Sequence, residues 1–329
     1  MYKKPALMMT LVFLVALSGC ADMPMLSGWL GGTEVEQYTN DVVVIKEVKV
    51  TPVPIVQPGQ TLSLSAVVKN VQEIGFDVKR DVTVTIYDTC GIFTIEGSGL
   101  CGGDWTNSGQ TCLFKELYPQ TENEIIWRLR ANDIKVEQSC NVGIEVKYSY
   151  YTETTSSVDF ASQKEVERMI REGEGTSSVG KMTLGEGPVK LYIQVPNQPI
   201  LVGDDFEKSN GILEFWAENK GSGIVDGGKV TYFKINNSVE GRAKFRKTLE
   251  DTNSYDEIIA KDYIKGAPGE TDYSITMQLI NKKTPKNTWI ITPGNENIGK
   301  IRDRIYLTGI VTYDYKFTKT IKLTVQPIR

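Results

Sequence analysis

Histidine is absent from the 329-residue sequence. Its absence excludes Ser-His-Asp and Cys-His nucleophilic catalysis, the common histidine-bearing zinc sites and a histidine pH switch. The enzymes that remain use only carboxylate, lysine, tyrosine or serine side chains. A carboxylate pair for glycoside hydrolysis can be picked out anywhere among 41 aspartate and glutamate residues, so solvated surface charge explains these residues better. We therefore expect a protein that is not an enzyme, with no catalytic residues, no cofactor and no metal site.

Long apolar runs are scarce as well. Residues 6–17 form an apolar run of 12 residues, whereas a helix needs roughly 20 to cross the core of a bilayer. Lys3 and Lys4 precede this run and small residues close it, which is the layout of a secretory signal peptide. We therefore expect the chain to be exported.

The segment that closes the run, residues 17–20, reads Leu-Ser-Gly-Cys. It resembles the lipobox of prokaryotic lipoproteins, and the resemblance implies that Cys20 takes a diacylglyceryl group and becomes the first residue of the mature chain. Two acyl chains hold a protein stably at a membrane. The alternative is an ordinary cleaved signal that happens to contain a cysteine. We expect residues 1–19 to be a signal peptide and residues 20–40 a lipid-anchored tether on the outer face of the cell membrane.

Positive charge is not in excess. The formal net charge is −4, and removal of Lys3 and Lys4 with residues 1–19 lowers it by two, to −6. A nucleic-acid partner needs a basic face that neutralises phosphates, so nucleic acid is excluded. The partners that remain are the membrane, reached through the lipid on Cys20, and an unidentified protein or glycan.

Cysteine is rare, but its few positions are informative. Four cysteines follow Cys20, an even number within one segment of an exported chain, which predicts two disulfides. A zinc site with four cysteine ligands is the alternative, although such sites bring pairs two to four residues apart. Three pairings are possible. We prefer Cys90 with Cys140, because one ends a candidate strand and the other begins a candidate strand, and Cys101 with Cys112 as a staple of the intervening loop.

From residue 41 the sequence changes to short β-branched runs separated by turn residues. Runs of this kind without intervening helices indicate antiparallel sandwiches rather than βαβ units. Within residues 82–87 valine and isoleucine alternate with threonine and tyrosine, as in a sheet with one buried face. The candidate strands are residues 42–50, 61–70, 82–87, 124–129 and 142–151, and then 189–195, 212–219, 229–235, 272–280, 305–314 and 318–325.

One helix is predicted between the two sets of strands. Ser162 and Glu165 have the spacing of a capping box, and Gly173 supplies a stop. Val166, Met169 and Ile170 would form its apolar face. Residues 173–187 are rich in glycine, serine and threonine and are predicted to be a linker. The expected domains are a first sandwich with two disulfides at residues 41–160, a helix and flexible linker at 161–187, and a second sandwich at 188–329.

The two sets of strands resemble each other in order. A strand that ends in Lys69-Asn70 corresponds to one that ends in Glu218-Asn219, and residues 143–150 resemble residues 309–315. These similarities predict an approximate tandem repeat.

Residues 46–52 (Lys-Glu-Val-Lys-Val-Thr-Pro), 58–70 and 217–223 resemble the Ig-like adhesion modules of archaeal and bacterial surface proteins, especially the CARDB type. The resemblance implies an all-β fold of two tandem Ig-like antiparallel sandwiches. It says less about function, because sandwich surfaces host many unrelated activities. Residues 91–112 and 238–269 extend beyond the basic module and are where a specific binding site is expected.

Three functions follow as hypotheses. The first is a lipid-anchored envelope protein that acts as a noncatalytic structural or adhesive binding module. The second is a noncatalytic accessory subunit of an envelope secretion, transport or surface-layer complex. The third, and weakest, is a histidine-free hydrolase.

Several isolated motifs carry less weight. Asn236 begins an Asn-Asn-Ser sequon for possible glycosylation. Asp204 and Asp205 fit an ordinary turn better than a calcium site. Residues 175–181 imitate a phosphate loop but have Met182 where magnesium needs a hydroxyl, and residues 97–102 imitate a dinucleotide loop without a following helix. An aromatic strip could form from Tyr148, Tyr150, Tyr151, Tyr313 and Tyr315, although strand spacing favours a division between core and surface.

Overall fold

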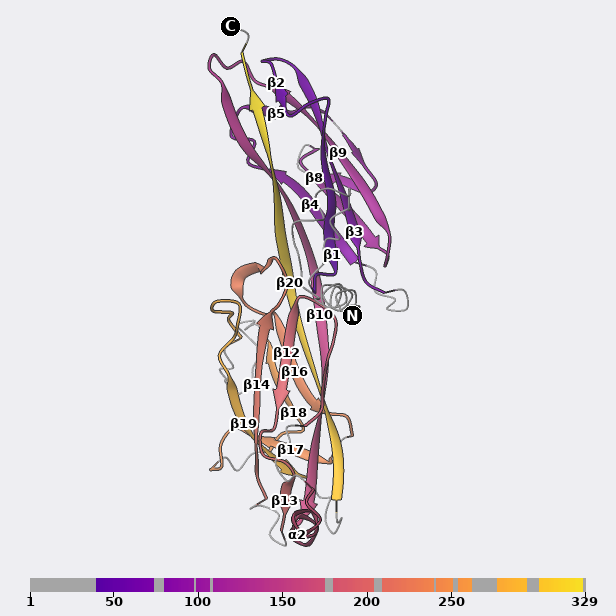
Figure 1. The fold of residues 1–329 in the computed structure, drawn as a ribbon, viewed down its shortest axis with the longest axis vertical. Coiled ribbons are helices and arrows are strands. Elements are labelled where there is room, and N and C mark those ends of the chain that lie inside the picture. Colours follow the sequence, from indigo (N-terminus) through magenta and orange to yellow (C-terminus); the bar gives the residue numbers. More distant parts are fainter. Residues whose placement is uncertain are drawn as a thin grey trace, which may run out of the picture. The chain divides into compact units, whose positions relative to one another are not determined.

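The computed structural model describes residues 40–73, 80–97, 99–106, 109–174, 180–203, 209–239, 241–250, 254–261, 277–294 and 302–327. The expected signal peptide, Cys20 and the tether up to residue 39 lie outside these residues, as do Asp204 and Asp205. The described part is almost entirely β-structure arranged in three sheets (Figure 1). The all-β prediction is confirmed.

Two of the sheets have the same strand order. Sheet A consists of β1 (Val43–Thr51), β3 (Thr61–Asn70), β9 (Glu122–Ala131) and β5 (Phe93–Ile95), with β6 (Leu100–Cys101) also on β9. Sheet C consists of β12 (Val189–Gln194), β14 (Gly211–Asn219), β19 (Asn287–Pro293) and β17 (Ala243–Arg246). Every pairing within them is antiparallel.

Sheet B backs both of the others. Its path runs β18 (Glu257–Lys261), β16 (Tyr232–Asn237), β20 (Arg302–Val325), β10 (Gln138–Ser162), β4 (Arg80–Tyr87), β8 (Thr111–Leu117) and β7 (Asp104–Thr106). Four short strands join it at the sides: β2 (Ile55–Val56), β11 (Met182–Leu184), β13 (Ile200–Val202) and β15 (Ile224–Val225). A 3-10 turn, η3 (Asp226–Gly228), follows β15.

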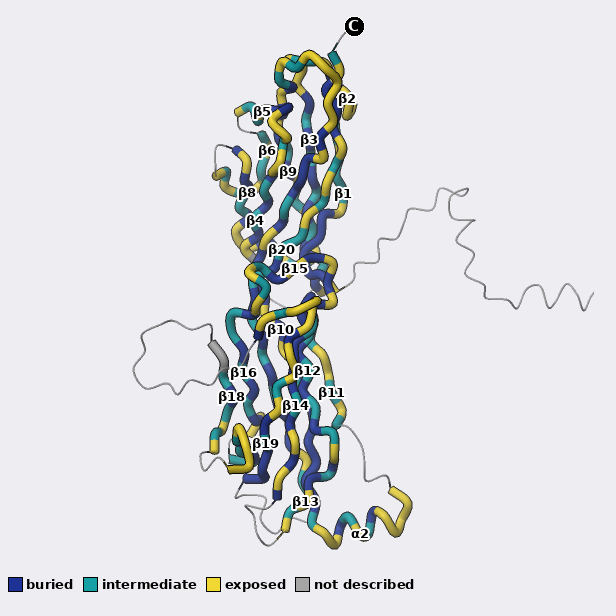
Figure 2. Tube along the Cα trace, turned by 90° about the vertical axis from the view of Figure 1, so that its left-hand side faces the viewer, coloured by how far each residue is buried: buried dark blue, intermediate teal, exposed yellow. Residues whose placement is uncertain are grey.

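Alternating side chains build the core of each sandwich. Every second residue is apolar and buried from Leu62 to Val68 in β3 and from Val82 to Ile86 in β4, and the alternation predicted for residues 82–87 is confirmed (Figure 2). These inward residues are Leu62, Leu64, Ala66 and Val68 on β3 and Val82, Val84 and Ile86 on β4. Burial of one apolar face per strand is the main stabilising contribution in such a sheet.

Two long strands join the sandwiches. β10 and β20 pair antiparallel without interruption from Gln138 opposite Val325 to Ala161 opposite Arg302, and in Figure 1 they run side by side through both sandwiches. The first half of β10 also pairs with β4, and the first half of β20 pairs with β16. Each strand therefore begins in one sandwich and ends in the other.

The predicted domain limits, 41–160 and 188–329, differ from this arrangement. The end of β20 lies in the first sandwich, where Leu323 is opposite Cys140 and Val325 is buried next to β2. The end of β10 correspondingly lies in the second sandwich, where it pairs with β11 and β13. The sandwiches are thus interleaved along the sequence.

Equivalent asparagines support the predicted repeat. Asn70 ends β3 and Asn219 ends β14, and both are buried. Each side-chain oxygen accepts a hydrogen bond from the backbone nitrogen two residues on, at 3.1 Å in Asn70 and 3.0 Å in Asn219. Each side-chain nitrogen donates to a backbone carbonyl, that of Leu117 at the end of β8 for Asn70 and that of Gly223, four residues on, for Asn219. The same residue type closes the same turn in both sandwiches.

The proposed equivalence of residues 143–150 with 309–315 differs in one respect. Gly143 lies on the outer face, where an added Cβ would meet the Tyr87 ring, whereas an added Cβ on Gly309 would meet Leu191 and Ile193 in the core. The two segments match in composition while their first residues face opposite sides of sheet B.

The predicted helix is α2 (Gln163–Arg171). The Ser162 hydroxyl accepts a hydrogen bond from the Glu165 backbone nitrogen, and Gly173 follows the helix with a positive φ of 73°. Met169 is buried, but Ile170 is 63% exposed, so the predicted apolar face is wrong at that position. The helix continues directly from β10. The segment that was predicted to be a linker contains β11, which pairs with Thr154–Ser156 of β10.

Candidate functional site

Tyrosines lie opposite one another in the middle of the β10–β20 pair. Tyr148 is opposite Tyr315 with ring centroids 5.6 Å apart, and Tyr150 is opposite Tyr313 with centroids 6.2 Å apart. These four rings are buried, whereas Tyr151, the fifth tyrosine of the predicted strip, is exposed. The predicted aromatic strip is therefore a core element rather than a binding surface.

The tyrosine hydroxyls attach neighbouring segments to this pair of strands. The Tyr150 hydroxyl accepts a hydrogen bond from Gln72 Nε2 at 2.6 Å, and the Tyr313 hydroxyl accepts one from the Val189 backbone nitrogen at 3.2 Å. The Tyr315 hydroxyl accepts one from the Gly223 backbone nitrogen at 2.7 Å. Burial raises the pKa of Tyr315, so its phenol stays protonated. The cluster of four buried tyrosines therefore has a structural role.

A carboxylate joins the two sandwiches near these rings. Asp41 lies two residues before the start of β1 and is only 8% exposed. It accepts hydrogen bonds from the backbone nitrogen of Ser222 at 3.1 Å and from the Ser222 hydroxyl at 2.6 Å. Ser222 lies between β14 and β15 in the second sandwich.

Two other acidic side chains, Asp226 on η3 and Asp159 on β10, are held by basic partners. Hydrogen bonds from Lys147 and then Lys316 lower the pKa of Asp226 to about 2. Asp159 accepts hydrogen bonds from Arg304 at 2.6 and 2.9 Å and from Arg302 at 3.4 Å. The Arg304 hydrogen bond holds the pKa of Asp159 below its usual range. Both carboxylates therefore stay ionised near neutral pH and are unsuited to donating a proton.

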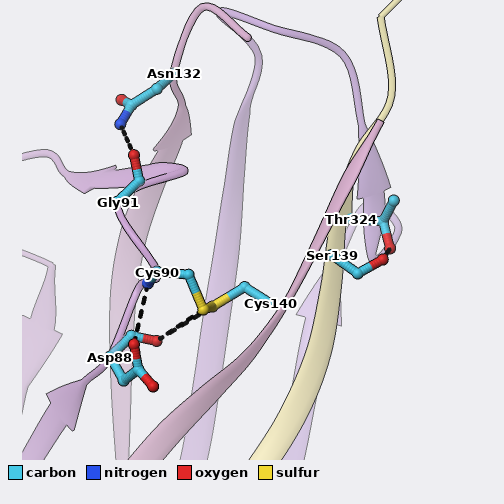
Figure 3. The surroundings of a disulfide bond; sticks show 7 residues. All are labelled: Asp88, Cys90, Gly91, Asn132, Ser139, Cys140 and Thr324. Atoms are coloured by element: carbon cyan, nitrogen blue, oxygen red, sulfur yellow. Dashed lines mark hydrogen bonds between the residues drawn. A yellow bond between two sulfur atoms is a disulfide. The ribbon is translucent and has the colours of Figure 1, made fainter. Parts of the chain in front are cut away.

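The cysteines form two disulfides with the preferred pairing. Cys90 is joined to Cys140 and Cys101 to Cys112, with Cα separations of 5.8 and 6.1 Å. Cys90 follows β4 and Cys140 lies near the start of β10, the strand that pairs with β4 (Figure 3). The metal-ligand cluster found in the described part of the chain is Asp88 with Cys90 and Cys140. Both sulfurs are in the disulfide, so neither is a thiolate that could bind zinc.

The remaining predicted sites are scattered. Asn236 is half-buried in β16 between Glu257 and Thr308 on the neighbouring strands. The extension at residues 91–112 contributes β5, β6 and β7, and the extension at 238–269 contributes β17 and β18. These residues do not converge on one site.

A different cluster was missed from the sequence. Tyr192 on β12 and Trp216 on β14 stack with centroids 5.0 Å apart and planes 6° apart. The ammonium groups of Lys283 and Lys286 lie 4.9 and 5.0 Å from the centre of the Trp216 ring. The available signal is Trp216 itself, since it stands at a polar-face position between Glu214 and Glu218. This cluster is the candidate functional site.

No helix in the described ranges has the length and apolar character that a membrane crossing requires.

No family model matches the chain, and no curated protein does. Among solved structures, the collagen adhesin CNA of S. aureus is 11% identical, with coverage of 88% of this chain and 94% of that chain and a TM-score of 0.14. The serine-rich repeat protein Srr2 of Streptococcus agalactiae is 8% identical, with coverage of 87% and 93% and a TM-score of 0.18. The C-terminal domain of the antigen I/II-family protein AspA of Streptococcus pyogenes is 11% identical, with coverage of 83% and 94% and a TM-score of 0.18. TM-scores this low carry no argument about function, which rests instead on the residues of this chain.

Proposed function

We propose that this chain is a lipid-anchored protein of the cell envelope whose two sandwiches, similar to the CARDB type, form a noncatalytic binding module of adhesive or structural kind. The uninterrupted pairing of β10 with β20 carries the proposal. Because each strand belongs to both sandwiches, the second sandwich cannot separate from the first without breaking this ladder. Such a connection suits a module that holds a binding surface away from a membrane.

Two further features support the proposal, one for the exported location and one for the tether. Disulfides persist in oxidising compartments outside the cytosol, and this chain has two. The carboxylate of Asp41 is fixed at the junction of the two sandwiches, directly after the expected tether. A pull on the tether would therefore reach both sandwiches.

Intact mass spectrometry of the membrane-extracted protein tests the anchor. The expected chain begins at Cys20, carries the mass of a diacylglyceryl group, and loses that mass in a Cys20→Ala variant that is found in the soluble fraction. A Ser18→Ala variant is the matched control, because it keeps a small residue before the cysteine. An unlipidated wild-type chain would overturn the anchor.

Cell attachment tests the binding module. Cells that display the wild-type chain should adhere to a ligand-coated surface, while cells with the Cys20→Ala variant should not. Turnover of any hydrolase substrate by the purified chain would overturn the noncatalytic part of the proposal.

A further inference from the structure

An indole is buried on the outer face of sheet C. In β14 the inward residues are Leu213, Phe215 and Ala217, so Trp216 points to the side that faces away from the core. The residue is nonetheless only 8% exposed, and its Nε1 hydrogen-bond donor is buried without a partner in the part of the chain that the structure describes. A buried donor without an acceptor is costly, and native proteins keep few of them. This donor therefore points to an acceptor that the described residues do not supply.

Two lysines cover the ring. Lys283 and Lys286 are both exposed, while the indole beneath their ammonium groups is buried. The Lys286 ammonium also donates to Glu214 at 2.7 Å, whereas no carboxylate of the described residues pairs with Lys283. Two ammonium groups over one ring repel each other, and an anion between them would relieve this repulsion. Long lysine side chains keep many rotamers available, so they can move aside without any change in the backbone.

The backbone that carries these lysines is fixed to β14. Asn281 and Lys282 have positive φ values of 50° and 69° in a tight turn that pairs Ile280 with Lys283. The next residue, Thr284, is buried, and it accepts a hydrogen bond from Ala217 N at its hydroxyl and donates one from its own nitrogen to Ala217 O. The site thus has fixed attachment points and movable side chains, which reduces the ordering cost of binding.

We propose that Tyr192, Trp216, Lys283 and Lys286, together the Trp216 site, bind an anionic saccharide. The anionic group lies between the two ammonium groups and accepts the hydrogen bond of Trp216 Nε1. The flat C–H face of the sugar replaces the lysine chains on the indole. A uronate and a sulfate ester offer the same chemistry to these donors. An acidic peptide lacks the flat face, so it is disfavoured. This inference deepens the proposed adhesive function by naming the ligand class, and it rests on that function.

Calorimetric titration of the full chain in mild detergent tests the Trp216 site. The probes are oligogalacturonate, a sulfated dextran oligosaccharide, an uncharged dextran of equal length, and polyglutamate of equal charge. We expect one or both charged saccharides to bind and the uncharged dextran not to bind. Trp216→Phe keeps an aromatic ring without the donor and should weaken binding roughly tenfold, as expected for a lost hydrogen bond to a charged group.

A charge-matched control separates this site from general attraction. Lys283→Ala with Lys286→Ala should abolish binding, and because both lysines are exposed the variant should fold normally. Lys135→Ala with Lys322→Ala removes the same charge from exposed positions on the first sandwich and should bind like the wild type. Binding to only one of the two charged saccharides identifies the anionic group.

Three outcomes would overturn the inference: no binding to either charged saccharide, equal binding of polyglutamate, or equal loss in the two double-lysine variants. The assay does not depend on anchoring. Absent binding by a chain that carries its lipid therefore refutes the ligand class alone, and a missing lipid on a chain that binds refutes the anchor alone.

Discussion

The Asp41 carboxylate lies against Ser222, which is 181 residues further along the chain, and accepts hydrogen bonds from both its backbone nitrogen and its hydroxyl. Asp41 leads into the first sandwich, and Ser222 belongs to the second. This contact therefore closes the junction between them.

Removal of this carboxylate should destabilise the whole described unit. We expect Asp41→Ala to lower the free energy of unfolding by about 2–3 kcal/mol, since hydrogen bonds to a charged group contribute more than neutral ones. Ser222→Ala keeps the backbone donor and should cost only about 1 kcal/mol. Urea denaturation measures both, with Asp133→Ala as a control, because that exposed carboxylate pairs with no described residue. Additive losses in the double variant would show that the two side chains do not interact.

Core truncations on either side of the junction should affect one shared unfolding transition. Leu323 and Leu191 are both fully buried, the first in the first sandwich and the second in the second sandwich. Leu→Ala at such positions costs about 2–5 kcal/mol. Because β10 and β20 belong to both sandwiches, we expect either variant to shift a single calorimetric peak. Two resolved peaks, with one of them unmoved in each variant, would show that the sandwiches unfold independently.

Much of the fold could be predicted because the responsible signals are local. Alternation in residues 82–87 gave a strand with one buried face, and the capping box at Ser162 gave the start of α2. The cysteine pairing followed from the ends of neighbouring strands. Each of these inferences uses residues that lie close together in sequence or at the end of one strand.

The continuity of β10 could not be predicted, because the part of it at residues 152–156 lacks an apolar alternation. The residues that point inward there are Thr152, Thr154 and Ser156, all buried. Thr152 can be buried because its hydroxyl hydrogen-bonds to the Tyr313 hydroxyl at 2.9 Å, and Tyr313 is 161 residues away. The polar sequence pattern of this segment therefore predicts that the strand ends there.

The Trp216 site was missed for a similar reason. Its lysines follow a tight turn at Asn281-Lys282, about 70 residues after Trp216 in sequence, and only the pairing of Thr284 with Ala217 brings them over the ring. The register between distant strands determines this contact, and that register cannot be derived from a single sequence.

Acid should remove the stabilisation that Asp159 provides. Arg304 holds the pKa of this carboxyl below its usual range, so its contribution is complete above the unfolded pKa of about 3.9 and is lost as the pH falls through the lower folded value. Asp159→Asn should therefore lower the free energy of unfolding at pH 7 by about 1–3 kcal/mol, which appears as a lower Tm. It should also lose less stability than the wild type between about pH 5 and pH 2. Calorimetry across this range measures both effects, with Asp133→Asn as the control. Parallel Tm curves for wild type and Asp159→Asn would contradict the assignment.

The two disulfides should contribute unequally, because they close loops of different length. Cys90 and Cys140 are 50 residues apart and Cys101 and Cys112 are 11 apart. The loop-entropy relation assigns about 4 kcal/mol to the longer loop and about 3 kcal/mol to the shorter. We expect the Cys90→Ser/Cys140→Ala variant to have the lower urea midpoint, and Cys101→Ser/Cys112→Ala the higher one, with each compared with the wild type under oxidising and reducing conditions. Under reducing conditions the three proteins should nearly coincide, apart from the packing lost at the buried alanines. A larger loss from the Cys101 pair would mean that local order in the extension at residues 91–112, rather than loop length, sets the contribution of each bond.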